Sequence, residues 1–151
     1  MLEAVAGEPV AIRALTRDDF AAVVAIDAEI EGRSRTAYVE RRLKAALAAP
    51  HLHAQFAASG SRGLVGYVLA RVLEGEFGRA ENAVRLEMVG VRPDARGQGV
   101  GTRLFTALAE WARRHGVGTV RTATAWNDFR MLRWLDAMAF GLAPNVIVEC
   151  A

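Results

Sequence analysis

The chain has 151 residues, of which 52% are hydrophobic and 24% charged, and its formal net charge is +2 at pH 7. These values are those of an ordinary globular protein, and the length fits one domain over residues 1–151. The near balance of charges, without a run of one sign, argues against a nucleic-acid partner.

A single cysteine, Cys150, excludes an intramolecular disulfide and a cysteine-based zinc site. The first residues lack the basic start and apolar run of a signal peptide. No segment approaches the roughly 18 uncharged apolar residues of a membrane span. We therefore expect a cytoplasmic protein without a membrane partner.

The first half of the sequence predicts one strand followed by two helices. VAIRAL (10–15) has the composition of a strand, and Thr16 with Asp19 three residues later is typical of a helix start. That helix would end near Gly32. TAYVERRLKAALAA (36–49) predicts the second helix, which would end before Pro50.

Three strands are predicted next. HLHAQFAAS (51–59) and LVGYVLARVLE (64–74) flank the turn GSRG and predict a hairpin, and AVRLEMVGVRP (83–93) predicts a strand that Pro93 ends. The sheet would therefore begin as an antiparallel meander.

After the third of these strands, the spacing of hydrophobic residues changes from that of a strand to that of a helix. A helical pattern runs from Val100 to His115, VGTVRTATAW (117–126) predicts a strand, and FRMLRWLDAMAF (129–140) predicts a helix. LAPNVIVECA (142–151) predicts a last strand. The order βααβββαβαβ contains a strand–helix–strand crossover, so we expect an α/β fold with a mixed sheet and helices on both faces.

RPDARGQGVG (92–101) lies between a predicted strand and a predicted helix. It lacks the lysine of a P-loop, and the third glycine of the dinucleotide fingerprint would fall on Thr102. Glycines before a helix N-terminus nevertheless suit a phosphate-sized anion, because the first helical N–H groups have no partner. A plain glycine turn is the alternative.

VGVRPDARGQGVGTRLF resembles the acetyl-CoA-binding motif of the GCN5-related N-acetyltransferases (GNAT). The family signature is Arg/Gln-x-x-Gly-x-Gly/Ala, and Arg96, Gly99 and Gly101 fill it. The order of predicted elements also agrees with the GNAT fold along essentially the whole chain. The resemblance therefore implies an acyl-CoA N-acyltransferase fold.

The resemblance also implies which residues would bind coenzyme A. Loop amides would hold its pyrophosphate, and these belong to Arg96, Gly97, Gln98, Gly99, Val100, Gly101 and Thr102. A bulge at MVGV (88–91), for which Gly90 is suited, would expose the backbone of Val89, Gly90 and Val91 to the pantetheine arm and the acetyl carbonyl. Asn127 occupies the place of a cofactor-binding asparagine, and it is equally suited to capping the last helix.

Glu87 stands where relatives often have a general base that acts through water. An outward-facing glutamate on a half-exposed strand is the alternative. Many relatives carry a tyrosine on the last helix that protonates the departing thiolate, but Leu135 occupies that position here. Tyr67, on the predicted strand 64–74, would serve instead only if it faced the groove.

The acceptor is poorly specified by the sequence. In the family, the loops corresponding to 29–37 and 74–82 line the acceptor groove. Their glutamates would receive a cationic amine or would be ordinary solvated charges; they are Glu29, Glu31, Glu74 and Glu76. His51 and His53 lack further ligands nearby, so no metal is expected.

The resemblance implies an acetyl-CoA-dependent N-acetyltransferase whose acceptor is a primary amine of a small molecule or a protein. The amine would attack the thioester directly in a ternary complex. The alternative is a non-catalytic acyl-CoA-binding sensor or assembly module of the same fold, which Leu135 favours. Many relatives dimerise through C-terminal strands, so a homodimer through NVIVEC is left open.

Overall fold

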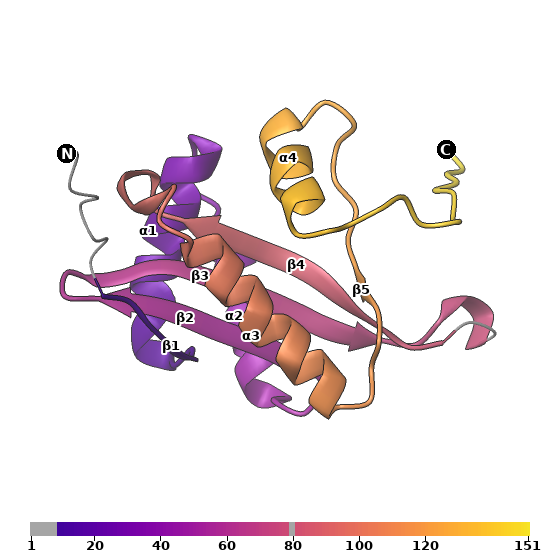
Figure 1. Ribbon diagram of the computed structural model, residues 1–151, viewed down its shortest axis with the longest axis horizontal. Helices are drawn as coiled ribbons and strands as arrows, with labels where there is room; N and C mark the ends of the chain where they lie inside the picture. The colour runs from indigo at the N-terminus through magenta and orange to yellow at the C-terminus, as the bar shows by residue number, and fades with distance from the viewer. Residues whose placement is uncertain (1–8, 79–80) are drawn as a thin grey trace, which may run out of the picture.

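The computed structural model describes residues 9–78 and 81–151, without the side chain of Glu76. Its centre is a five-stranded sheet in the order β1-β2-β3-β4-β5 (Figure 1). The strands are β1 (Ala11–Ala14), β2 (His53–Gly60), β3 (Gly63–Leu73), β4 (Ala83–Val91) and β5 (Val120–Arg121).

The first four strands are antiparallel neighbours, and β5 is parallel to β4. The connection from β4 to β5 is helix α3 (Val100–Arg114), which crosses one face of the sheet (Figure 1). The predicted meander and crossover are therefore confirmed, and the fold is the expected α/β fold with a mixed sheet.

Helices cover both faces of the sheet. α1 (Phe20–Glu31) and α2 (Thr36–Ala48) lie on the face opposite α3, and α4 (Phe129–Ala137) lies beyond the β4 edge (Figure 1). A 3-10 turn, Arg17–Asp19, precedes α1. The predicted helix start is confirmed, because the backbone N–H of Thr16 donates to the Asp19 carboxylate at 2.8 Å.

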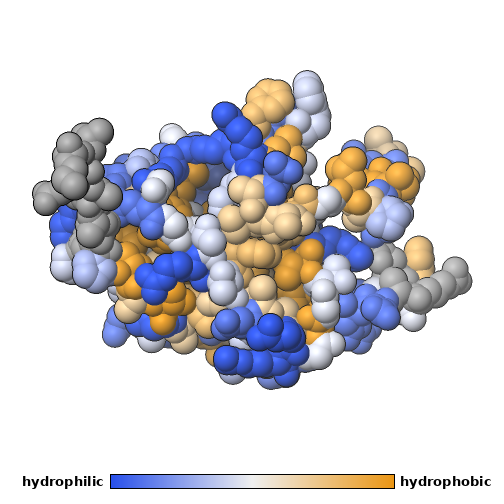
Figure 2. Space-filling model, viewed as in Figure 1, coloured by the Kyte–Doolittle hydropathy of each residue, from blue (hydrophilic) through white to orange (hydrophobic). Residues whose placement is uncertain are grey.

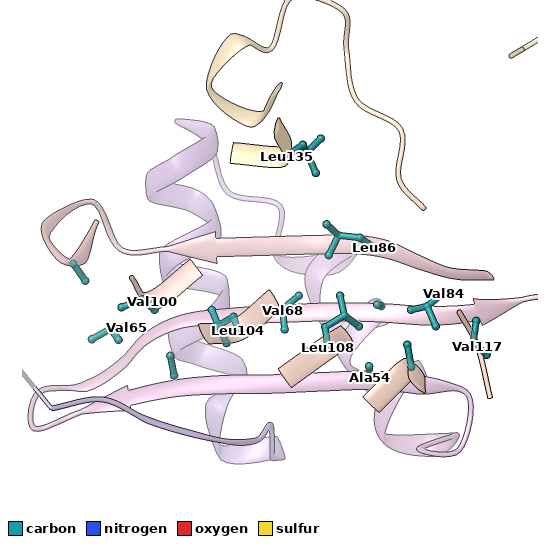
Figure 3. Packing of buried hydrophobic residues seen from close by; sticks show 14 residues of the cluster. Ala54, Val65, Val68, Val84, Leu86, Val100, Leu104, Leu108, Val117 and Leu135 are labelled. Atoms are coloured by element: carbon teal, nitrogen blue, oxygen red, sulfur yellow. The ribbon is translucent and has the colours of Figure 1, made fainter. Parts of the chain in front are cut away.

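Each face of the sheet carries its own core. On one side, Leu104 and Leu108 of α3 pack over Val68 of β3 (Figure 3). On the other side, Val23 of α1 and Leu43 of α2 cover the sheet. Hydrophobic residues that alternate along β3 serve both cores, so the sheet is buried on both faces there.

The prediction of a last strand over residues 142–151 is wrong. Residues 138–151 contain neither helix nor strand, and the strand predicted over 117–126 is only Val120–Arg121. Because β5 is so short and Pro144 has no N–H to donate, there is little edge on which another strand could pair. Leu142, Val146, Ile147 and Val148 are consequently exposed, and they form the hydrophobic projection on the side of the C-terminus in Figure 2.

Candidate functional site

A β-bulge lies at Glu87. Leu69 pairs with Met88, but the next residue of β3, Ala70, pairs with Leu86, so Glu87 is an extra residue in β4. The bulge was predicted within residues 88–91, with Gly90 as its suitable residue, and this position was wrong. Gly90 pairs in register with Tyr67.

The reason for a glycine at position 90 is the tyrosine ring beside it. A Cβ at position 90 would lie 2.8 Å from the Tyr67 ring, closer than side chains tolerate. Tyr67 itself is buried in the core under α1 and α2. Gly90 therefore serves close packing and not a bulge.

Strands β4 and β5 separate soon after they meet. They pair only at Val84–Val120 and Arg85–Arg121, and the Thr122 hydroxyl then donates to the Leu86 carbonyl at 3.0 Å. From residue 87 to residue 91 no strand pairs with the outer side of β4 in the described structure. A ligand can hydrogen-bond to the backbone there as a strand would.

The glycine loop precedes α3 at the end of this gap. Gly97 and Gly99 have φ values of 76° and 79°, which favour glycine. Within the described part of the chain, the backbone N–H groups of residues 97–102 donate no hydrogen bond. Successive free amides at the N-terminus of a 15-residue helix form a site that suits an anion.

Two arginines add positive charge near these amides. Burial, followed by the neighbouring Arg130 guanidinium, lowers the pKa of Arg96 below its ordinary value. Arg130 lies in the first turn of α4, where a cation opposes the helix dipole. The sequence analysis missed Arg130, although its place directly after the predicted start of a helix near the loop was a signal.

Trp134 of α4 packs against the start of α3. A Cβ at Gly101 would lie 2.8 Å from the indole Nε1, and the indole also meets the Phe105 ring edge-on at 6.1 Å between centroids. Gly101 therefore permits α4 to approach the loop. This contact was not anticipated from the sequence.

The sequence left two roles open for Asn127, contact with the cofactor and capping of α4. The structure gives the capping role to its neighbour Asp128. Asp128 is the N-cap of α4, and its carboxylate accepts from the Met131 N–H at 3.1 Å. Asn127 is exposed, and its side chain makes no hydrogen bond to another described residue. The cap is Asp128, so the Asn127 amide has hydrogen-bonding capacity left for a ligand.

Glu87 points inward and is surrounded by positive charge. Its side chain is only 8% exposed, and its Oε1 lies 3.2 Å from Arg71 Nε and 3.5 Å from Arg42 Nη1. The outward-facing alternative is therefore wrong. Its apolar neighbours in sequence, Leu86 and Met88, are only part of its environment.

An open pocket of about 210 Å³ contains Glu87. It is lined by Tyr38, Arg42, Arg71, residues 85–89, residues 122–124 and Met131. Among the glutamates predicted for an acceptor groove, Glu29, Glu31 and Glu74 do not line it, and Glu31 instead pairs with Arg35 at 3.4 Å. The Glu76 side chain and residues 79–80 of the loop 74–82 lie outside the described part.

The position of the missing tyrosine is filled by a core residue. Leu135 is 6% exposed and belongs to the same buried cluster as Leu86, above which Figure 3 shows it on α4. Tyr67 is 2% exposed, and burial, followed by the charge of Asp27, raises its pKa. Its hydroxyl thus stays protonated at neutral pH, next to Gly90.

Residues 9–78 and 81–151 contain no group of three or more histidine, cysteine, aspartate or glutamate side chains placed to hold a metal ion. None of the helices in this part has both the length and the apolar character to cross a bilayer.

Comparisons with known proteins agree with this arrangement. The chain resembles AAC(6')-Iy, solved with the bisubstrate analogue CoA-S-monomethyl-acetylneamine, at 19% identity and a TM-score of 0.75, over 95% of this chain and 98% of that one. It resembles the aminoglycoside 6'-N-acetyltransferase AAC(6')-Ih from Acinetobacter baumannii at 14% identity and a TM-score of 0.81, with the same coverages.

A third solved structure, a transcriptional regulator from Bacillus halodurans C-125, matches at 20% identity and a TM-score of 0.78, over 95% of this chain and 99% of that one. At these identities the likeness is one of fold. No curated protein sequence matches significantly. The model of the acetyltransferase (GNAT) family matches residues 11–140, so the chain belongs to the GNAT family of acetyltransferases.

Proposed function

We propose that this protein is an acetyl-CoA-dependent N-acetyltransferase that acts on a primary amine by direct attack in a ternary complex. The observation that carries the proposal is the continuity of the free amides of residues 97–102 with the gap beside β4, in which Glu87 lies. AAC(6')-Iy, a solved structure of the same fold, is in complex with a CoA-containing bisubstrate analogue, which supports the choice of donor.

Coenzyme A would bind along the loop and β4. The free backbone amides of residues 97–102 would hold the pyrophosphate, with the side chains of Arg96 and Arg130 balancing its charge. The backbone of residues 89–91 would hydrogen-bond to the pantetheine arm and the acetyl carbonyl, since no strand occupies that side. Asn127 would add an amide contact. The stretch from Val91 to Glu87 spans about 13 Å, which separates the anion site from the reacting end.

The reaction joins the amine nitrogen to the acetyl carbon. The nitrogen lone pair attacks the thioester carbonyl, the C–S bond breaks, and the electron pair leaves on sulfur as thiolate. The nitrogen loses a proton, which Glu87 would accept directly or through water. The products are an N-acetylated amine and coenzyme A.

Protonation of the thiolate does not need a residue at position 135. A thiol has an ordinary pKa of about 8.5, so the thiolate is a competent leaving group and can take its proton from water. The Tyr67 hydroxyl is protonated and lies beside Gly90, but its side chain is buried in the core. Leu135 has no part in proton transfer.

Calorimetry and a thiol-release assay test the proposal together. We expect coenzyme A to bind and ATP not to bind, because the loop lacks the lysine of a P-loop. Thiol release over a panel of amines and peptides should fall more than tenfold in Glu87→Gln. Glu110→Gln, a matched change on the exposed surface of α3, should leave the rate unchanged.

Each outcome has a distinct meaning. Binding of ATP without binding of coenzyme A would refute acetyl-CoA as the donor. Coenzyme A binding with thioester hydrolysis that no acceptor accelerates would favour the non-catalytic acyl-CoA-binding module. An unchanged rate in Glu87→Gln would refute the role of Glu87 as general base but not the transferase activity.

A homodimer is part of the proposal. The exposed side chains of Leu142, Val146, Ile147 and Val148 are apolar, and a second copy would cover them. Sedimentation of the full chain should give a dimer, and deletion of residues 142–151 should give a monomer. A monomeric full chain at micromolar concentration would contradict this part.

A further inference from the structure

The pocket around Glu87 is strongly basic. Its lining contains the three arginines Arg42, Arg71 and Arg85 against one carboxylate, Glu87. That carboxylate already pairs with Arg42 and Arg71, whereas Arg85 forms no ion pair with another described residue. The pocket therefore retains uncompensated positive charge.

The arrangement of these arginines lowers the stability of the folded chain. Arg71 of β3 and Arg85 of β4 are direct cross-strand partners, and like charges placed opposite each other destabilise a sheet. The Nε atom of Arg42 is buried without a hydrogen bond in the described structure, whereas Arg71 Nε lies 3.2 Å from the Glu87 carboxylate. The facing like charges of Arg71 and Arg85 and the unbonded Arg42 Nε both favour a ligand that supplies an anionic acceptor.

The donor substrate does not account for these arginines. Its pyrophosphate is assigned to residues 96–102, which follow the far end of β4, and Arg85 lies about 20 Å from that end along the strand. Tyr38 and Arg42 of α2, on the face of the sheet opposite α3, belong to the lining of the pocket. The charge is thus on the α2 side of the sheet, away from the glycine loop that precedes α3.

We infer that the acceptor is a small amine that carries an anionic group, a carboxylate or a phosphate. This inference rests on the proposed function. The amine would lie at Glu87 and the anion among Arg42, Arg71 and Arg85, whose planar guanidinium groups suit both anions. A polycationic amine of the aminoglycoside type would instead meet three like charges.

The size of the pocket agrees with a small acceptor. Its volume of about 210 Å³ is below the roughly 300–1,000 Å³ of pockets for drug-sized ligands. Thr122 and Thr124 add hydroxyl groups to the lining opposite β4. A short amino acid or amino phosphate fits these conditions better than a multi-ring amine.

The test uses amines in matched pairs. 4-Aminobutyrate is compared with butylamine, O-phosphoethanolamine with ethanolamine, and neamine represents a polycation. We expect kcat/KM for each anionic amine to exceed that of its partner at least tenfold, and the larger of the two ratios identifies carboxylate or phosphate as the preferred group. Equal or better use of butylamine, ethanolamine or neamine would overturn the inference.

Variants of Arg85 connect the preference to the pocket. Arg85→Gln should lower the anionic-to-uncharged ratio at least tenfold, and Arg85→Glu should reverse it. Arg114→Gln, on the exposed end of α3, should leave the ratio unchanged. An unchanged ratio in both Arg85 variants, with melting temperatures equal to that of the wild type, would refute the role of this pocket.

A binding measurement separates this inference from the proposed function. Calorimetry of the protein saturated with coenzyme A should show 4-aminobutyrate or O-phosphoethanolamine binding at millimolar concentration, and butylamine not binding. If anionic amines bind but no amine releases thiol, the proposed function fails, and only the preference of the pocket for an anionic amine as ligand is retained. If coenzyme A binds and no anionic amine binds, the inference fails alone.

Discussion

The indole of Trp134 occupies the space that a side chain at Gly101 would need, with Nε1 only 2.8 Å from the position of a Cβ. Gly99, two residues earlier in the same motif, has nothing within 4 Å of its Cβ position but a φ of 79°. Two glycines of one signature thus exist for different reasons, one for packing and one for backbone conformation.

The effect of Gly101→Ala on the free energy of unfolding should change sign with the residue at position 134. Alanine is favoured over glycine in a helix by about 1 kcal/mol, whereas overpacking costs about 1 to 3 kcal/mol. We therefore expect no gain or a loss of up to about 2 kcal/mol in the wild type, and a gain in the Trp134→Phe background. Urea unfolding of the four proteins of the double-mutant cycle measures this.

Gly99→Ala is the matched comparison. It should cost about 1 to 2 kcal/mol in both backgrounds, because a left-handed conformation is unfavourable whatever Trp134 does. Equal effects of Trp134→Phe on both alanine variants would contradict the separate explanations of the two glycines.

Gly90→Ala should destabilise the protein by about 1 to 3 kcal/mol. The Tyr67 ring that it would meet is 2% exposed and has no free space into which to move. Thermal and urea unfolding measure the loss. Gly118→Ala, where nothing lies within 4 Å of the added Cβ, should stay within about 0.5 kcal/mol of the wild type.

Leu135→Ala should reduce the free energy of unfolding by about 2 to 5 kcal/mol, because it leaves a cavity between α4 and β4. Its kcat in thiol release, measured well below the melting temperature, should change little. Leu142→Ala, at a fully exposed position, should change stability by less than about 0.5 kcal/mol. A large loss of kcat with unchanged stability would mean that Leu135 acts in the reaction.

The Arg13–Asp19 pair should make stability depend on pH in the acid range. Hydrogen bonds from Arg13, at 2.8 Å to each carboxylate oxygen, are the main cause that lowers the pKa of Asp19. A depressed pKa in the folded state adds stability above the unfolded pKa of about 3.9, and this is lost as pH falls through the folded pKa.

Asp19→Asn should therefore lower the free energy of unfolding at pH 7 by about 1.5 to 3 kcal/mol, and the difference from the wild type should shrink below pH 4. Urea unfolding at both pH values measures it. A difference that persists unchanged at pH 2.5 would show that the charge of Asp19 is not the stabilising factor.

The elements and the loop could be predicted because their signals are local. Hydrophobic periodicity located four helices and most of the sheet, and the glycines after Pro93 located the start of α3. The last strand could not be judged in this way, since residues 142–151 have the composition of a strand but no edge on which to pair. Strand formation depends on a neighbour that the sequence does not display.

The environment of Glu87 also could not be predicted from local sequence patterns. Its neighbours in sequence, Leu86 and Met88, are apolar, but Arg42 comes from α2 and Arg71 from β3. Arg42 and Arg71 are separated from Glu87 by 45 and 16 residues in the chain. The register of β3 with β4 brings Arg71 to Glu87, and the packing of α2 on that face of the sheet brings Arg42.

The bulge at Glu87 has a consequence for how this strand can change in evolution. Before the bulge, Val84 and Leu86 point toward α3, whereas after it Val89 and Val91 do so and Met88 points the other way. Glu87 and Met88 thus both face the side of α1 and α2, so deletion of the extra residue would restore regular alternation and leave Val89 and Val91 facing α3. The bulge adds one side chain to the pocket without changing which residues of β4 form the core. A member of the family could therefore lose the residue at position 87 without repacking its core, but it would lose the carboxylate with it.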